Sequence, residues 1–336
     1  MFIRDRWYVA AWDKEVGRKP LARTICGEPV VLYRRTDGAA VALEDACPHR
    51  LLPLSMGCVE GDGIRCGYHG LKVDDTGQAV DMPGEERPPR LKTRAYPVLE
   101  RYRFVWVWIG DPERADPAVL PDFWFCEDPD WAFDGDVYPV RCDYRLLVDN
   151  LMDLSHETYV HPTSIGQQEI VEAPIETRLE GQQVVVERWM KGIDAPPFWR
   201  TFLGKPGLVD RWQICRFMLP SAVAIEVGVA PVGTGAPEGD RSQGVEGVVV
   251  NFMSPETETS CWYYWGMARK FGIRDAGLSD RMRQSQAGVF AEDVVVLEAQ
   301  QRAIDLRPGA RLVTLGIDAG GAHARRLIER AAAGAG

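Results

Sequence analysis

Histidine is scarce in this chain, with 5 among 336 residues, and long runs of Lys or Arg are absent. The formal net charge of -10 leaves no basic footprint of the kind that a nucleic-acid backbone or an anionic membrane surface requires. No apolar run approaches the roughly 18 residues that suggest a membrane span. Charges also interrupt the N-terminal sequence MFIRDRWYVAAWDKE, where a secretory signal needs an apolar segment. We therefore expect a cytoplasmic protein that binds neither nucleic acid nor membrane.

A dense group of cysteines is also absent. The 8 cysteines are spread along the whole sequence, which does not fit a disulfide framework. Most of them are expected to be small buried hydrophobic residues. With 46% hydrophobic and 26% charged residues, the chain has the composition of a globular protein, and its length suggests two domains.

The first part of the chain has the pattern of short strands separated by turns. Segments 29–34, 38–44 and 104–109 are rich in Val, Trp and other strand-forming residues and are bounded by Gly or Pro. Segment 113–121 is polar and contains proline, as expected of a connector. We predict a domain of strands over residues 1–115. A second domain over residues 116–336 mixes helices with strands, such as those at 183–189 and 248–253, so the fold class is α+β.

Two of the histidines lie beside cysteines. The motif Cys47-Pro-His49 is followed, after sixteen residues, by Cys66-Gly-Tyr-His69. Two thiolates and two imidazoles can hold a [2Fe-2S] cluster, with both thiolates on one iron and both imidazoles on the other, which makes the cluster a mild one-electron donor. A zinc site is the alternative, but zinc fingers usually keep their cysteines together and their histidines together. The alternation of Cys and His in each loop favours the cluster.

Two more histidines, His156 and His161, lie five residues apart in a stretch rich in carboxylates. On an ideal helix this spacing separates them by about 140°, so the helix has to end between them if both are to bind one metal. Pro162 favours such an end, because the residue before a proline avoids the α conformation. A His-x4-His pair alone more often reflects packing or solvent exposure. The upstream motif strengthens the metal interpretation, because an iron–sulfur donor needs an acceptor.

A third ligand is expected from the helix-like stretch 287–300. On a helical wheel, Glu292 and Glu298 lie about 100° and 140° from Asp293 and are expected at the rim or surface. Asp293 itself lies on the apolar face, because several of the residues within about 60° of it are apolar: Val289, Phe290, Val296, Leu297 and Gln300. A buried carboxylate needs a partner such as a cation. His156, His161 and Asp293 would form the facial triad that binds Fe(II) and leaves positions open for O2.

These motifs resemble those of the Rieske non-heme iron oxygenases, within the group of vanillate O-demethylase, dicamba and toluenesulfonate methyl monooxygenases. The resemblance extends over nearly the whole chain and includes segments 6–12, 148–156, 255–260 and 290–293. It implies an N-terminal all-β Rieske domain and a C-terminal α+β catalytic domain with an antiparallel sheet. It also implies the ligands of both iron centres: Cys47, His49, Cys66 and His69 for the [2Fe-2S] cluster, and His156, His161 and Asp293 for the mononuclear Fe(II).

The resemblance suggests roles for two further residues. Asp153 matches the family's bridging aspartate, which links a cluster histidine of one subunit to the iron site of its neighbour. Its alternative role is a hydrogen bond that orients His156. Asn150 matches the same motif in a supporting role. Proteins of this family form head-to-tail homotrimers in which each active site needs two chains. One departure from the family pattern is Trp262, where relatives often have a histidine that could hold a polar or anionic substrate group.

The expected reaction follows from counting electrons. Inserting one atom of O2 into a C–H bond and reducing the other to water takes two external electrons, of which the cluster stores one. The chain has neither a G-x-G-x-x-G fingerprint nor a ferredoxin C-x4-C-x2-C motif. We therefore expect a partner reductase that uses NAD(P)H and carries a flavin and a ferredoxin-type cluster.

We predict a monooxygenase that hydroxylates a methyl or methoxy group of a small aromatic substrate. A hydroxylated methoxy group collapses to a phenol and formaldehyde, so the outcome there is O-demethylation. One alternative is hydroxylation of a ring carbon or a non-aromatic carbon by the same iron centre. Another is a Rieske electron carrier without oxygenase activity.

Overall fold

A computed structural model describes residues 2–334, and the contacts within the chain divide it into two compact units. The N-terminal unit comprises the residues up to Asp122 together with Ser254–Glu258. The C-terminal unit comprises Phe123–Met253 and the residues from Thr259 onward. The predicted domain boundary between residues 115 and 116 lies between two single-turn 3-10 helices, η3 (Pro112–Arg114) and η4 (Pro117–Val119), and it stays a prediction.

The N-terminal unit consists of three small sheets in which every strand pairing is antiparallel, and its described residues form no α-helix. The first sheet contains β1 (Arg6–Trp12), β11 (Phe104–Ile109) and β10 (Val98–Arg101). The second contains β2 (Leu21–Ile25), β3 (Glu28–Arg34), β4 (Ala40–Glu44) and β9 (Ala95–Tyr96). The third contains β5 (Cys58–Glu60), β6 (Gly63–Arg65), β7 (Lys72–Val73) and β8 (Ala79–Asp81). The predicted all-β character of this part is therefore confirmed.

The C-terminal unit contains one sheet of seven strands. Their order across the sheet is β12 (Ala132–Val140), β18 (Ser260–Arg269), β17 (Val245–Thr257), β16 (Ala222–Pro231), β15 (Val209–Met218), β14 (Gln183–Ile193) and β13 (Ile175–Glu180). Neighbours from β13 to β17 pair antiparallel as successive hairpins, and β12 pairs antiparallel with β18. This arrangement confirms the predicted α+β class with an antiparallel sheet.

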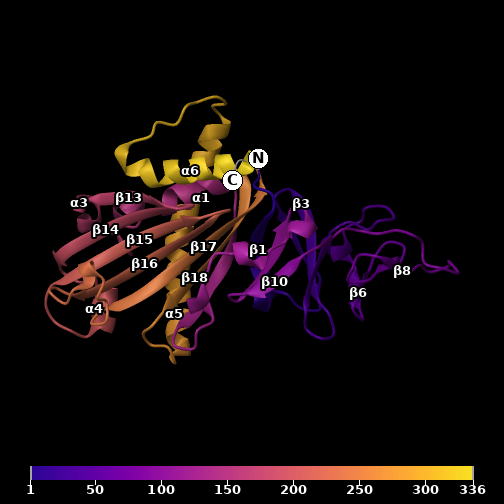
Figure 1. Ribbon diagram of the computed structural model, residues 1–336, viewed down its shortest axis with the longest axis horizontal. Coiled ribbons are helices and arrows are strands. Elements are labelled where there is room, and N and C mark those ends of the chain that lie inside the picture. The colour runs from indigo at the N-terminus through magenta and orange to yellow at the C-terminus, as the bar shows by residue number, and fades with distance from the viewer. Residues whose placement is uncertain (1, 335–336) are drawn as a thin grey trace. The chain divides into compact units, whose positions relative to one another are not determined.

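Six α-helices accompany this sheet among the described residues: α1 (Tyr144–Leu151), α2 (Glu157–Val160), α3 (Gln168–Glu172), α4 (Pro197–Leu203), α5 (Ala276–Asp305) and α6 (Ala319–Ala332). Figure 1 shows α5 crossing the sheet and α6 lying alongside α1. Within residues 2–334, no helix combines the length and apolarity needed to cross a membrane.

Helix α5 places Asp293 against the sheet. The helix is capped by Asp275, whose carboxylate accepts a hydrogen bond from the Leu278 N–H (2.9 Å), and it then runs from Ala276 for 30 residues without a proline. Apart from the adjacent pair Val289 and Phe290, its buried residues follow one another at intervals of three, four or seven, as expected of a helix with one face on a core: Leu278, Met282, Val289, Phe290, Asp293, Leu297 and Gln301.

The wheel was wrong about two residues of α5. Val296 and Gln300 were placed on the Asp293 face, but both are exposed, whereas Gln301 is buried. The buried stripe follows steps of four residues, each of which turns the helix by about 40°, so the contact winds around α5 towards its C-terminal end. A helical wheel assigns one fixed buried face to the whole helix, so it does not show a buried face that winds around the helix axis.

Candidate metal centres

The two Cys-His motifs lie in loops with the same backbone pattern. In each loop the cysteine N–H donates to the carbonyl five residues later, and the cysteine carbonyl accepts from the N–H four residues later. These N···O distances are 2.9 and 2.8 Å for Cys47, and 2.8 and 3.2 Å for Cys66. The residue four positions after each cysteine has a positive φ, 60° at Leu51 and 78° at Gly70. Glycine adopts this conformation without strain, whereas Leu51 costs about 1–2 kcal/mol, so the first loop is held in shape by its surroundings.

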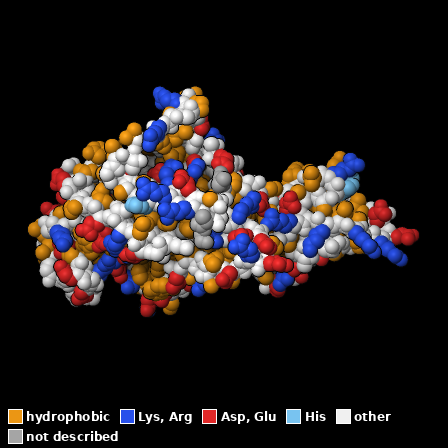
Figure 2. All heavy atoms as spheres, turned by 45° about the horizontal axis from the view of Figure 1, so that its top comes forward, with side chains coloured by type: hydrophobic (Ala, Val, Ile, Leu, Met, Phe, Trp, Pro, Cys, Tyr) orange, Lys and Arg blue, Asp and Glu red, His pale blue; other side chains and the backbone are white. Residues whose placement is uncertain are grey.

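The thiols of these loops are buried and the imidazoles are exposed. Cys47 and Cys66 are 2% and 3% exposed and belong to one hydrophobic core cluster. His49 and His69 are exposed, with ring centroids 4.8 Å apart, and Figure 2 shows an imidazole at the surface of this unit. Burial and the neighbouring Cys66 raise the pKa of the Cys47 thiol. Two buried thiolates would be costly without a cation, so the donor set fits an iron cluster bound by thiolates inside and imidazoles outside.

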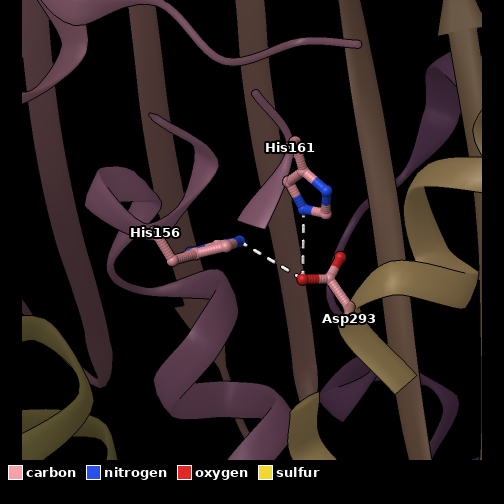
Figure 3. A group of neighbouring side chains, drawn as sticks. All are labelled: His156, His161 and Asp293. Atoms are coloured by element: carbon pink, nitrogen blue, oxygen red, sulfur yellow. Dashed lines mark hydrogen bonds and ion pairs between the residues drawn. The ribbon is translucent and has the colours of Figure 1, made fainter. Parts of the chain in front are cut away.

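The second group of predicted ligands converges on one point. The Nε2 atoms of His156 and His161 lie 3.4 and 3.2 Å from Oδ1 of Asp293, as Figure 3 shows. In the part of the chain that the structure describes, this is the only group of three or more His, Cys, Asp or Glu residues whose donor atoms all lie within 4.8 Å of one another. His161 and Asp293 are buried and His156 is partly buried. Two neutral nitrogens and one carboxylate oxygen fit a single Fe(II) ion.

Local backbone geometry explains how two histidines five residues apart meet. After α1, a 3-10 turn η6 (Leu154–His156) leads directly into the one-turn helix α2. Helix α2 ends at Val160, and His161 follows it with φ -117° and ψ 45°, outside the α region. The predicted end of the helix between His156 and His161 is thus confirmed, and Pro162 is the residue that disfavours its continuation.

Both imidazoles are oriented by hydrogen bonds at the nitrogen that faces away from Asp293. Nδ1 of His156 lies 2.6 Å from the backbone carbonyl of Asp153, and Nδ1 of His161 lies 2.6 Å from Oε2 of Glu292. A carbonyl and a carboxylate accept hydrogen bonds, so Nδ1 donates in both residues and Nε2 is directed towards the metal position. The Asn150 amide also donates to Oδ1 of Asp293 (3.3 Å).

The sequence-based view of Asp153 and Glu292 was incomplete. The group of Asp153 that orients His156 is its backbone carbonyl, whereas its carboxylate accepts from the Ser155 N–H (2.9 Å). Glu292 lies at the rim as predicted, with its side chain 42% exposed, yet it also holds His161. The helical wheel gave the direction of Glu292 but not this contact.

Charges within the group favour an ionised carboxylate. Burial disfavours ionisation of Asp293, but the hydrogen bonds and charges of His156 and His161 outweigh it and lower the pKa to about 2. Burial also disfavours protonation of the two imidazoles, but Asp293, assisted by Glu292 at His161, raises the pKa of each. The metal-free group therefore holds protons that a cation would have to displace.

An aromatic wall from β18 packs against α5 beside Asp293. The Phe290 ring lies 5.3 Å from Tyr263 and 4.8 Å from Trp265, centroid to centroid. The Tyr263 hydroxyl donates to Oδ1 of buried Asn251 (2.7 Å), and burial together with the charge of Asp293 raises the Tyr263 pKa. Because side chains alternate along a strand, Trp262 lies on the sheet face opposite α5. Trp262, the expected departure from the family pattern, therefore does not face α5 and Asp293.

Comparisons with known proteins match both parts of the chain. A family model described as the vanillate O-demethylase oxygenase C-terminal domain matches residues 140–334, and one described as the Rieske [2Fe-2S] domain matches residues 6–100. The vanillate O-demethylase oxygenase subunit of Pseudomonas sp. (strain HR199 / DSM 7063) is 48% identical to this chain. The similarity covers 98% of this chain and 95% of the Pseudomonas subunit. The toluene-4-sulfonate monooxygenase system iron-sulfur subunit TsaM1 of Comamonas testosteroni is 39% identical, covering 98% and 97%.

A solved structure is similar along the whole chain. The crystal structure of dicamba monooxygenase with non-heme iron and dicamba is 36% identical, covers 99% of this chain and 98% of its own, and superposes with a TM-score of 0.85.

Proposed function

Since the chain belongs to the Rieske non-heme iron oxygenases, in the family of the vanillate O-demethylase oxygenase subunits, we propose that it hydroxylates a methyl or methoxy group of a small aromatic substrate. The protein is the oxygenase component of a Rieske-type monooxygenase, and it uses a [2Fe-2S] cluster and a mononuclear non-heme iron. As in other multicomponent oxygenases, a separate reductase supplies its electrons. The convergence of His156, His161 and Asp293 within the matched oxygenase domain is the observation that carries the proposal.

We assign the cluster to two loops, and the mononuclear iron to helix α5 and the segment from His156 to His161. Buried thiols and exposed imidazoles support the cluster ligands Cys47, His49, Cys66 and His69. The shared position of three donor atoms supports the iron ligands His156, His161 and Asp293. When bound, the iron centres supply one-electron transfer and activation of O2.

The chain's own side chains prepare the site for that chemistry. Asp293 stays ionised at neutral pH, because its pKa is about 2, and so it offers a negative ligand without releasing a proton. Glu292 and the Asp153 carbonyl keep the two Nδ1–H groups fixed, which leaves both Nε2 atoms directed at the metal. Asn150 holds Oδ1 of Asp293. The buried rings of the β18 wall keep water away from this side of the site.

Partner and location follow from the same proposal. The Asp153 carboxylate is assigned the bridging role towards a cluster histidine of a neighbouring subunit, which requires a head-to-tail homotrimer. The reductase is expected to oxidise NAD(P)H and to carry a flavin and a ferredoxin-type cluster. We place the enzyme in the cytoplasm, where NAD(P)H is available to that reductase.

Product analysis tests the proposed reaction. The purified oxygenase, supplied with O2 and an NAD(P)H-dependent reductase, is incubated with methoxybenzoates, and with methylbenzenesulfonates that offer a methyl group instead. A methoxy substrate should give its phenol and formaldehyde in equal amounts, because the hydroxylated methoxy group is a hemiacetal that collapses to these two products. A hydroxylated product that keeps its methoxy group would favour ring hydroxylation instead. An Asp293→Ala variant serves as the control, and it should form neither product.

A further inference from the structure

We propose that Arg188 is a positioning residue that fixes the Asp153 carboxylate for electron transfer, an inference that rests on the bridging role proposed above for Asp153. Each hydroxylation transfers two electrons from the reductase to O2. The position of Asp153 affects the rate of this transfer and not its stoichiometry. The argument depends on how the turn that carries His156 is attached to the sheet beneath it.

Two neighbouring strands hold the residues on either side of His156. Arg188 on β14 and Gln213 on β15 are direct partners in the antiparallel register. Arg188 Nη2 donates to the Ser155 hydroxyl (2.8 Å), and Gln213 Nε2 donates to both carboxylate oxygens of Glu157 (3.0 Å each). The cross-strand pair Arg188 and Gln213 therefore holds the turn by hydrogen bonds to the residues directly before and after His156.

Arg188 also faces the carboxylate of Asp153. Its Nη2 lies 3.9 Å from Oδ1, the same oxygen that accepts from the Ser155 N–H at 2.9 Å. The Arg188 guanidinium and the Ser155 N–H therefore both face Oδ1 of Asp153, and neither of these two contacts involves Oδ2. The Arg188 side chain is 4% exposed and the Asp153 side chain is 15% exposed, so the guanidinium lies in the interior behind a carboxylate that reaches solvent.

The Asp153 carboxylate stabilises the buried positive charge of Arg188. Burial lowers the pKa of Arg188, and the opposing effects come from Asp153, Cys215 and Glu157, in that order. Nη1 of Arg188 is fully enclosed and has no hydrogen-bond partner among the described residues. A buried guanidinium is costly unless a nearby anion compensates it. Its strongest electrostatic partner is Asp153, so each group restricts where the other can lie.

A double-mutant experiment separates this role from a general structural one. The variants are Arg188→Met, Arg188→Lys, Asp153→Asn and the combination of Arg188→Met with Asp153→Asn. Arg178→Met is the matched control, because Arg178 lies on adjacent β13 with its side chain 41% exposed and paired with Glu180 and Glu187. Each enzyme is reduced under anaerobic conditions and mixed with O2 and substrate, and oxidation of the cluster is followed by its visible absorbance.

We expect Arg188→Met to slow cluster oxidation about tenfold while iron content and the spectrum of the cluster are retained. Arg188→Lys should recover part of the rate, because it keeps the charge but not the fork of donors. In the Asp153→Asn background, Arg188→Met should cause no further loss, because both changes act on one interaction. Arg178→Met should leave the rate unchanged. An unaltered rate in Arg188→Met, or an equal loss in both backgrounds, would overturn the proposal.

Hydrogen exchange gives a second measurement that requires no substrate. The amide of Ser155 donates to Asp153, so Arg188→Met should reduce the protection of this amide, and Arg178→Met should not. Unchanged protection would contradict the proposal even if every aromatic compound tested were rejected as a substrate. If Arg188→Met does not fold, Arg188→Lys provides both readouts. Loss of iron in Arg188→Lys would show a structural role and would also contradict the proposal.

Discussion

Replacing Glu292 should weaken binding of the mononuclear iron without removing any of the three proposed ligands. The Glu292 carboxylate lies 2.6 Å from Nδ1 of His161 and fixes the ring. Loss of such a partner typically lowers metal affinity about 10- to 100-fold, which corresponds to about 1.4–2.8 kcal/mol. Because the Glu292 side chain is 42% exposed, water can replace part of the interaction, and we expect an effect near the lower limit.

The size of the effect should depend on what replaces the carboxylate. In Glu292→Gln the amide oxygen can still accept from Nδ1, so affinity should fall less than in Glu292→Ala. Glu298→Gln is the matched control. It makes the same charge change on α5, but Glu298 accepts from the Arg141 N–H and not from a ligand residue.

The assay is an anaerobic Fe(II) titration of protein that keeps its cluster but has been stripped of mononuclear iron, in competition with a chromogenic chelator. We expect affinities in the order wild type and Glu298→Gln, then Glu292→Gln, then Glu292→Ala. Wild-type affinity in Glu292→Ala would refute the reasoning, as would equal weakening in Glu298→Gln.

Three further results are expected. The neighbouring carboxylates raise the pKa of His156 and His161 above 6.5. The contacts of the protonated imidazoles therefore stabilise the metal-free protein fully below that pH, and this stabilisation is lost as the pH rises through the raised pKa values. Fe(II) affinity should increase over the same pH range, as measured by titrations at several pH values. Phe290→Ala should lower the free energy of unfolding by about 3–5 kcal/mol in urea denaturation, whereas exposed Val295→Ala should change it by less than about 0.5 kcal/mol. Gly320→Ala should cost about 1–3 kcal/mol in the same assay, because a Cβ there would lie 2.4 Å from a methyl carbon of Val186.

Motifs of short range were predictable from the sequence. The Cys-x-His and Cys-x2-His loops carry the proposed cluster ligands within four residues, and the end of the helix before Pro162 follows from local backbone sterics. Asp293 could be selected because a carboxylate on an apolar helical face is conspicuous. These features need no knowledge of how distant elements pack.

Contacts between distant segments were not predictable in the same way. Glu292 reaches His161 only because α5 lies beside α2, and no periodicity within α5 encodes that distance. The winding of the buried stripe that exposes Val296 likewise depends on the surface that α5 crosses. The sequence did contain an indication that Arg188 has a buried partner. It follows Val184 and Val186 on the inward positions of a strand, and a charge at such a position requires a buried partner.

The most direct test of two iron centres in one chain is the iron content of wild-type and Asp293→Ala proteins, measured with the EPR spectra of their dithionite-reduced forms. Wild type should contain about three irons per chain, two in the cluster and one in the mononuclear site. Asp293→Ala should contain about two and show the same Rieske signal. An Asp293→Ala protein that kept the third iron, or a wild-type protein that bound no third iron after addition of Fe(II), would contradict the account.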